Sequence, residues 1–155
     1  MTAIETPTPA QFSEQELAAW RGPLQVHARV TELDSQMRAE HGLSVSFYEV
    51  LMLLAGSSER RLRMSEIASR VLLSRSGLTR LVDRLVQLGY VTRCAADTDG
   101  RGLDAELTDA GLAKFEAARL THREGVRQFF LDHLTPTDQI ACGGIWQRLM
   151  KAGDR

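Results

Sequence analysis

Arginine and hydroxyl side chains gather on one face of a helix that the sequence predicts from Ser74 to Gly89. At about 100° per residue, its leucines and valines fall on one side of the helix and its polar side chains fall opposite. Hydroxyl and guanidinium groups suit phosphate oxygens, and arginine can grip a guanine edge through two hydrogen bonds. The polar face carries Ser76, Thr79, Arg80, Asp83 and Gln87, with Arg75 in the first turn. This face predicts contact with duplex DNA.

A second candidate contact is the turn-rich loop 97–102, which carries Arg101 between two glycines. Asp-Gly is a strong hairpin signal, and strands are predicted on both sides of the loop, over 90–95 and 103–107. A thin loop tip with one arginine fits a minor groove, whose negative potential attracts arginine. For the loop alone, an ordinary solvated hairpin is an equal alternative. Its position directly after the 74–89 helix favours DNA contact.

The charge distribution supports a phosphate-facing middle segment. Nine arginines and four acids lie between residues 60 and 101, whereas the whole chain has a net charge of −1. A basic middle with acidic flanks is typical of a nucleic-acid-binding module on an acidic scaffold, although a solvated charged face is the alternative. The candidate DNA-contact residues are Ser65, Ser74, Arg75, Ser76, Thr79, Arg80, Arg84 and Arg101.

The elements around these residues form a recognisable order. Ser65 is expected to cap a short helix, three residues from Val71 to Leu73 form a turn, and Ser74 caps the longer helix. A short edge strand is predicted over 61–64, and the strand 103–107 should have one wet face carrying Asp104 and Glu106. A helix-turn-helix followed by a β-hairpin is a winged helix-turn-helix, so the expected fold class is mainly α, with a small β component.

Long helices flank this module. The first is predicted from Ser13 to about Glu40, with a kink or restart at Gly22-Pro23. A second, buried helix should begin near Ser44 or Ser46, and Ser46 with Glu49 would form a capping box. The helix from Thr108 to about His133 would be close to 40 Å long, too long for one small domain to bury. The last helix begins at Thr135-Pro136 and carries an apolar stripe of Cys142, Ile145, Trp146, Leu149 and Met150.

Other classes of chemistry find little support in the sequence. Cys94 and Cys142 are isolated, the four histidines form no metal motif, and no nucleophile–base pair or phosphate loop is present. We therefore expect no enzyme, no metal and no cofactor. No apolar run approaches the roughly 20 residues that span a bilayer, and the N-terminus has no signal-peptide pattern. The prediction is a cytoplasmic protein without a membrane partner.

Ligand-binding candidates are fewer. Trp20, His27, Phe47 and Leu51 could line a pocket between the first two helices. His27 is the polar group on its stripe, seven residues from Trp20. A core or interface histidine with a satisfied hydrogen bond is the favoured alternative.

Two segments resemble the multiple-antibiotic-resistance regulator (MarR) family. The run from Ser74 to Leu85, followed by Leu88 to Arg93, resembles the recognition helix of that family and the strand after it. Asp99-Gly100-Arg101 and the run from Leu107 to Gly111 resemble its wing and the start of the next helix. The similarity covers residues 13–151. It departs at Gly100, where many relatives carry a second arginine.

The resemblance implies a homodimer that binds a pseudo-palindromic operator and represses transcription. It implies a tail over 1–12, a helical dimerisation region over 13–43 and 109–155, and a winged helix-turn-helix over 44–108. Arg75, Ser76, Thr79 and Arg80 would face the groove, and Arg101 would be the wing arginine. A small aromatic or anionic effector would release the DNA. The alternative is a winged-helix module that binds protein instead of DNA.

Overall fold

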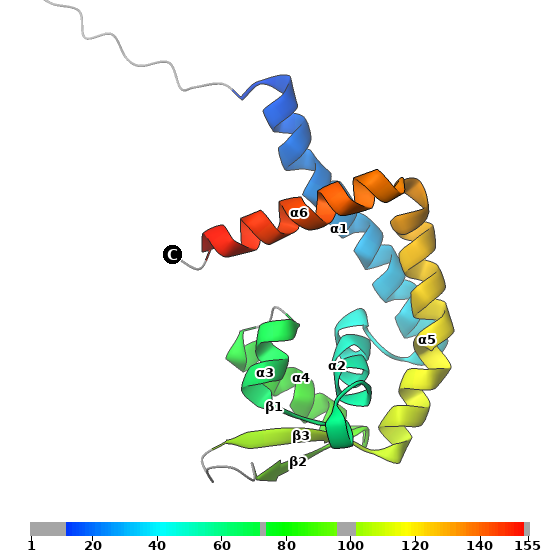
Figure 1. Ribbon diagram of the computed structural model, residues 1–155. Coiled ribbons are helices and arrows are strands. Elements are labelled where there is room, and N and C mark those ends of the chain that lie inside the picture. The colour runs from blue at the N-terminus through cyan, green and yellow to red at the C-terminus, as the bar shows by residue number, and fades with distance from the viewer. Residues whose placement is uncertain (1–11, 72–73, 96–101, 154–155) are drawn as a thin grey trace, which may run out of the picture.

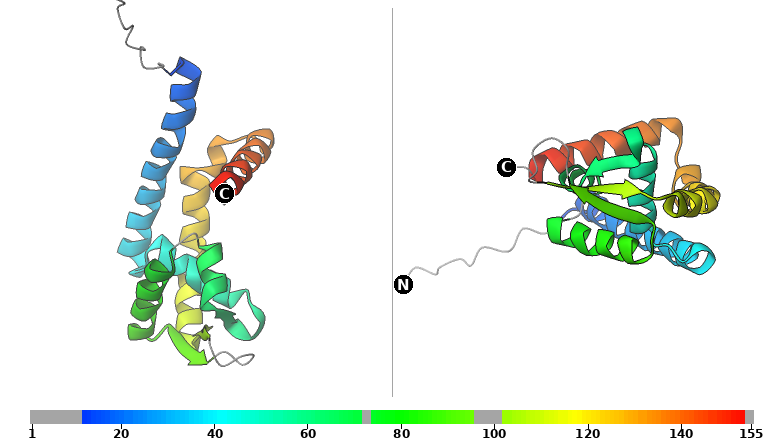
Figure 2. Two further views of the ribbon diagram at one scale, coloured as in Figure 1. Left: turned by 90° about the vertical axis from the view of Figure 1, so that its left-hand side faces the viewer. Right: turned by 90° about the horizontal axis from the view of Figure 1, so that it is seen from below.

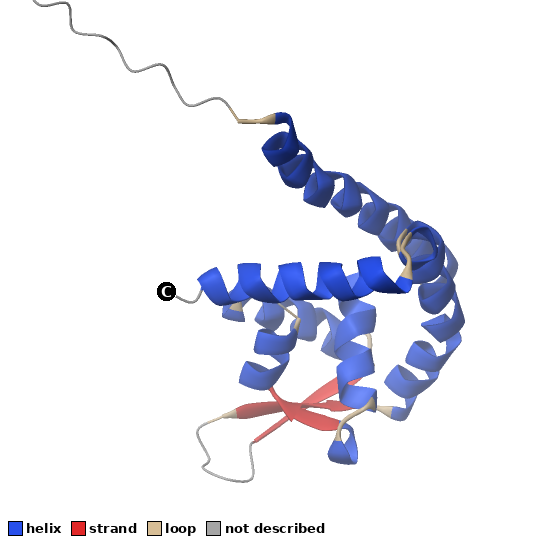
Figure 3. Cartoon of the chain, turned by 45° about the horizontal axis from the view of Figure 1, so that its top comes forward, coloured by secondary structure: helices blue, strands red, loops and turns tan. Residues whose placement is uncertain are grey.

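The computed structural model describes residues 12–71, 74–95 and 102–153. It is mainly helical, with one small antiparallel sheet (Figure 3). The sheet lies at the foot of the view in Figure 1, beneath α2, α3 and α4. Helix α6 and most of α1 lie above them, and α5 runs down the right-hand side from the start of α6 to the level of the sheet. The helices are α1 (Glu14–His41), α2 (Val45–Ala55), α3 (Met64–Arg70), α4 (Arg75–Gln87), α5 (Asp109–Phe129) and α6 (Pro136–Gly153), with 3-10 turns η1 (Ser58–Arg60) and η2 (Leu131–His133). The strands are β1 (Arg61–Arg63), β2 (Val91–Ala95) and β3 (Leu103–Leu107).

Helix α1 begins and ends as its sequence predicts. Ser13 and Glu16 form a reciprocal capping box, and Gly42 ends the helix in the left-handed conformation, with φ 63°. Of the kink or restart predicted at Gly22-Pro23, the restart is wrong, because α1 runs as one helix through Pro23. Proline removes one intrahelical hydrogen bond there, but the turns on either side continue the helix.

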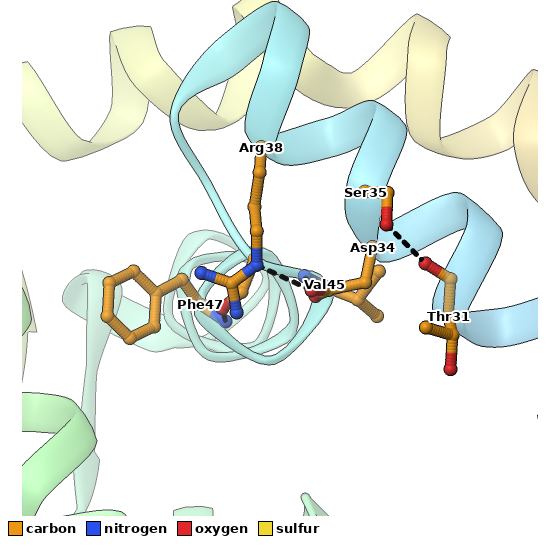
Figure 4. Close-up of polar contacts among 7 residues, drawn as sticks. Thr31, Asp34, Ser35, Arg38, Val45 and Phe47 are labelled. Carbon is orange, nitrogen blue, oxygen red and sulfur yellow. Dashed lines mark hydrogen bonds and ion pairs between the residues drawn. The ribbon is translucent and has the colours of Figure 1, made fainter.

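The predicted capping box of α2 is also wrong. Ser44, not Ser46, caps the helix, because the Ser44 backbone is extended and its hydroxyl oxygen accepts a hydrogen bond from the Phe47 amide at 3.1 Å. The Val45 amide donates to Asp34 of α1 at 2.8 Å, and the other Asp34 oxygen pairs with Arg38 at 2.5 Å (Figure 4). Asp34 therefore joins the end of α1 to the start of α2.

Helices α3 and α4 form the predicted helix-turn-helix. Helix α3 begins two residues earlier than expected, with Arg63 at the cap position, so Ser65 lies exposed in its first turn and does not cap it. Ser74 does cap α4, because its hydroxyl accepts a hydrogen bond from the Gly77 amide. The strands pair in the order β1-β3-β2, which places β1 at an edge as predicted.

The predicted wet face of β3 needs correction. Asp104 is only 8% exposed, whereas Leu103 is 51% exposed. Because β3 is the central strand, its side chains meet both neighbours, and Arg61 of β1 pairs with the Asp104 carboxylate at 3.0 Å. A buried carboxylate needs such a partner, since burial of an unpaired charge is costly.

The core joins the winged lobe to the long helices. Its buried residues lie between positions 33 and 118, in the helices α1 to α5, in the loop before α2 and in the strands β2 and β3: Leu33, Met37, Leu43, Tyr48, Val50, Leu51, Leu54, Ile67, Leu78, Val82, Leu85, Val91, Ala105, Leu107, Phe115 and Ala118. Helix α5 runs beside α1 (Figures 1 and 2), and a side chain on Gly125 would overlap Leu33 of α1. Helix α5 ends at Phe129, four residues before the predicted end, and a separate 3-10 turn follows.

The described helices include none that combines the length and the apolar character needed to cross a membrane.

The close contact at Gly111 predicts a stability effect. A methyl group there would overlap the Tyr90 carbonyl oxygen and the Leu107 side chain. We expect Gly111→Ala to lower the free energy of unfolding by about 1–3 kcal/mol, as overpacking does, in spite of the better helix propensity of alanine. Urea unfolding measures this change. The control is Ala113→Gly, which exchanges the same two residue types at an exposed site of the same helix and therefore measures helix propensity without the overlap. A Gly111→Ala protein as stable as the wild type would contradict the overlap at Gly111.

His122 predicts a pH dependence of stability. Its ring stacks on Tyr48, with 4.2 Å between centroids, and burial lowers the pKa of His122. The unfolded chain therefore binds a proton at this residue more readily than the folded chain, and folding loses stability as the pH falls below about 6.5.

Replacement of His122 by phenylalanine keeps a ring but cannot take up this proton. Thermal unfolding between pH 7.5 and 5 should show a smaller loss of stability for His122→Phe than for the wild type. Identical pH profiles of the two proteins would rule out His122 as the cause.

Candidate nucleic-acid interface

One face of α4 is buried and the other is open to solvent. Leu78, Val82 and Leu85 are essentially inaccessible, and they turn the polar side of the helix outward. On that outer side Ser76, Thr79, Arg80 and Arg84 are all exposed. This is the arrangement that the helical pattern predicts, because residues three or four apart share a face.

The N-terminal end of α4 presents hydroxyl groups. Ser74 is exposed, and its hydroxyl oxygen lies 3.2 Å from that of Ser76. The first amides of a helix carry partial positive charge, so this end is suited to a phosphate oxygen. Helix α4 begins at Arg75, but the side chain of Arg75 and the whole of Arg101 lie outside the described residues.

The positive charge of the middle segment is smaller than its sequence indicates. In the part of the chain that the structure describes, ion pairs join Arg60 with Asp109, Arg61 with Asp104, Arg70 with Glu66, and Arg93 with Asp83. Asp104 and Asp109 lie beyond the segment in sequence and reach it only through the fold. Among the described residues Arg80 has no ion-pair partner, and Arg84 donates to Gln87 at 3.0 Å. These two arginines leave a local excess of positive charge on α4.

Sequence reasoning missed Arg93. This strand residue reaches back to α4, where it pairs with Asp83 at 3.0 Å. The signal was present, since Asp83 is the acidic residue on an otherwise basic helix. The pairing itself depends on how β2 packs against α4, which the sequence pattern does not specify.

The proposed ligand residues are not arranged as one pocket wall. Trp20 and His27 are exposed on α1, whereas Leu51 is fully buried in the core and offers no surface to a ligand. Phe47 is partly buried against the core. An apolar cavity of about 280 Å³ lies instead between α1, α5 and α6, and it is lined by Val26, Arg29, Val30, Leu33, Val126, Phe129, Phe130 and Trp146.

The part of the chain that the structure describes contains no cluster of three or more histidine, cysteine or acidic side chains that could hold a metal ion. Cys94 and Cys142 are both partly buried and do not form a disulfide with each other.

Comparison with known proteins identifies the family. The MarR family model matches residues 41–102, which contain α2, the helix-turn-helix and the first strand of the hairpin, β2. The fold is similar to that of Sco3205, a MarR family transcriptional regulator from Streptomyces coelicolor whose crystal structure contains DNA. The two chains are 33% identical, with a TM-score of 0.87, over 93% of this chain and 91% of Sco3205. This chain belongs to the MarR family.

Curated HTH-type transcription regulators are similar over shorter stretches. The transcriptional regulator PapX of Escherichia coli is 30% identical over 126 residues, which are 81% of this chain and 67% of PapX. The repressor MdtR of Bacillus subtilis is 33% identical over 93 residues, which are 60% of this chain and 59% of MdtR. Family membership places the chain among transcription regulators and not among enzymes.

Proposed function

We propose that this MarR-family chain represses transcription by binding a pseudo-palindromic operator as a homodimer, with α4 in the major groove. The observation that carries the proposal is the outward face of α4, where Ser76, Thr79, Arg80 and Arg84 are exposed opposite a buried apolar stripe. In helix-turn-helix docking, the second helix enters the major groove by its N-terminal end. In this chain the Ser74 cap and Ser76 lie at that end.

The relatives agree with this assignment. MdtR is named as a transcriptional repressor, and Sco3205 was crystallised with DNA. Arg75 and Arg101 belong to the proposal on their positions in the sequence, as a groove-facing residue and the wing arginine. Ser65 is exposed on α3, the helix before α4, and we propose that it contacts the DNA backbone.

A second copy of the chain is proposed as the partner of α6. This helix makes only sparse contacts with other elements, yet Ile140, Leu149 and Met150 are more than half exposed, and Trp146 is 37% exposed. Trp20 and Leu24 of α1 are also exposed. These exposed apolar side chains favour association with a second copy, because their burial removes apolar surface from water. We therefore assign residues 13–43 and 109–155 to dimerisation and 44–108 to the winged DNA-binding lobe.

We also propose that side chains of the second copy fill the apolar cavity between α1, α5 and α6. Release of the DNA by a small aromatic or anionic effector stays a prediction from the family resemblance. Two-fold symmetry would set the two α4 helices about one DNA turn, or ~34 Å, apart.

DNA binding is tested by selection from a random-sequence duplex library, followed by titration of the selected duplex at several salt concentrations. Binding should weaken steeply with salt, because arginine contacts displace counterions from phosphates.

We expect Arg80→Ala to weaken binding and to lower the log–log salt slope by roughly 0.9, the value for one lost phosphate contact. Arg119→Ala is the control, since Arg119 is exposed on α5 and pairs with Glu116. An unchanged slope for Arg80→Ala would remove Arg80 from the interface, and a wild-type chain that binds no duplex would refute the function.

Dimerisation is tested by sedimentation of two charge variants of α6. Trp146→Asp should give monomers, because it places a carboxylate in the apolar face and an unpaired buried charge is costly. Gln147→Asp adds the same charge one residue further along the helix and should leave dimers intact. Truncation before Thr135 should also abolish dimers. Dimers that survive both Trp146→Asp and the truncation would overturn the assigned interface.

A further inference from the structure

Asp83 is an acidic residue on the exposed face of α4 that we assign to DNA. A carboxylate on such a surface repels phosphate, because like charges raise the energy of the complex. Asp83 is 51% exposed, but one of its oxygens lies 3.0 Å from Nη1 of Arg93. The ion pair neutralises the charge and joins α4 to β2.

Arg93 holds α4 at a second point. Its Nη2 donates a hydrogen bond to the carbonyl oxygen of Thr79 at 3.2 Å. Thr79 and Asp83 are four residues apart and therefore lie on the same face of the helix. One planar guanidinium group thus spans a full turn of α4, which lysine could not do with a single ammonium group.

The Arg93 side chain is turned inward. It is only 26% exposed, and its Nε is buried without a hydrogen-bond partner. Leaving a polar group unsatisfied costs free energy. The conformation is retained at this cost, which indicates that the two bonds to α4 hold the guanidinium in place.

The two bonds from Arg93 to α4 lie next to the sharp turn that connects α4, the proposed recognition helix, to the β2–β3 hairpin. Gly89 has φ 74°, and the Tyr90 amide donates to the Leu85 carbonyl, so a turn of only three residues, 88–90, separates α4 from β2. Strand β2 pairs with β3 along its whole length, from Val91 with Leu107 to Ala95 with Leu103. The base of the hairpin also packs in the same core as α4, where Val91 and Leu107 are buried with Val82. The bonds of Arg93, two residues further along β2, extend this contact and resist a change of the angle between β2 and α4.

We propose that Arg93 is a positioning residue that fixes the angle between α4 and the β2–β3 hairpin, so that both can reach the same DNA segment. This inference rests on the proposed DNA-binding function. It assigns Arg93 to specificity and not to phosphate contact. If the hairpin rotated relative to α4, the hairpin and α4 could not contact the same DNA segment at once. When the angle is fixed, a duplex of the selected sequence can bind both elements together, and a random duplex cannot.

The test compares two duplexes of equal length, the selected duplex and one of random sequence. The measured quantity is the specificity ratio, the Kd for the random duplex divided by the Kd for the selected one, at several salt concentrations. The variants are Arg93→Gln, Arg93→Lys, Asp83→Asn and the double variant Asp83→Asn with Arg93→Gln. Arg119→Gln is the matched control, because it removes an arginine from an exposed ion pair on another helix.

We expect each single variant to lower the specificity ratio about tenfold, and the double variant to lower it no further, because both residues act through one interaction. Arg93→Lys should behave like Arg93→Gln, since lysine keeps the positive charge but cannot bond to the Asp83 carboxylate and the Thr79 carbonyl oxygen at the same time. The salt slope of Arg93→Gln should equal that of the wild type. Thermal melts confirm that each variant is folded.

Three results in the variants would overturn this proposal alone. A specificity ratio that stays at the wild-type value in Arg93→Gln, with a salt slope lower by roughly 0.9, would make Arg93 a direct phosphate contact. Full specificity in Arg93→Lys would show that charge alone matters. Losses that add in the double variant would show independent roles. A wild-type chain that binds no duplex would overturn the proposed function and this inference with it, whereas loss of the inference alone leaves wild-type binding intact.

Discussion

The burial of one side of α4 determines which residues this protein shows to its surroundings. Leu78, Val82 and Leu85 are removed from water in the same core as α2 and β3. Full burial of such side chains stabilises a fold by about 1.5–3 kcal/mol each, so rotation of the helix about its axis is strongly disfavoured. The polar side of α4 is therefore held outward. This outward direction follows from apolar packing, whereas the polar bonds of Arg93 concern the angle between α4 and the hairpin.

A second set of contacts joins this lobe to the long helices. Asp34 of α1 accepts a hydrogen bond from the first amide of α2, and Tyr48 of α2 packs against Phe115 and His122 of α5. Where α5 passes α1, Gly125 permits an approach that a side chain would block. The position of α4 relative to α1 and α5 therefore depends on close packing, which responds to changes as small as a methyl group. In a symmetric dimer, the same contacts would set the distance between the two recognition helices.

Ion pairing changes the electrostatic picture that the sequence suggests. Several arginines of the middle segment hold parts of the fold together: Arg61 stabilises the buried Asp104, and Arg60 binds the first residue of α5. Exposed pairs such as Arg70 with Glu66 contribute little to stability, about 0–1 kcal/mol, but they reduce the charge available to a phosphate. The exposed arginines of α4 are a small fraction of the basic residues counted in the segment. Binding by this surface would depend on the placement of a few charges.

Much of the architecture was predictable from local sequence. The Ser13, Ser74 and Thr108 caps, the stripe of α4 and the order of helix, turn, helix and hairpin all follow from interactions between residues close in the chain. Local rules failed where two signals competed. Ser44 and Ser46 were both plausible caps of α2, and the contact of Val45 with Asp34 accompanies the choice of Ser44.

Tertiary structure alone decided the pairings between distant residues. Nothing near Asp104 in sequence indicates that Arg61 will reach it across the sheet, or that Arg93 will return to Asp83 and Thr79. The same holds for Leu51, whose burial makes it core and not ligand pocket, and for the cavity between α1, α5 and α6. The physical reason is that periodicity and capping report the energies of neighbouring residues, whereas charge pairing and cavities depend on distances that only chain packing sets.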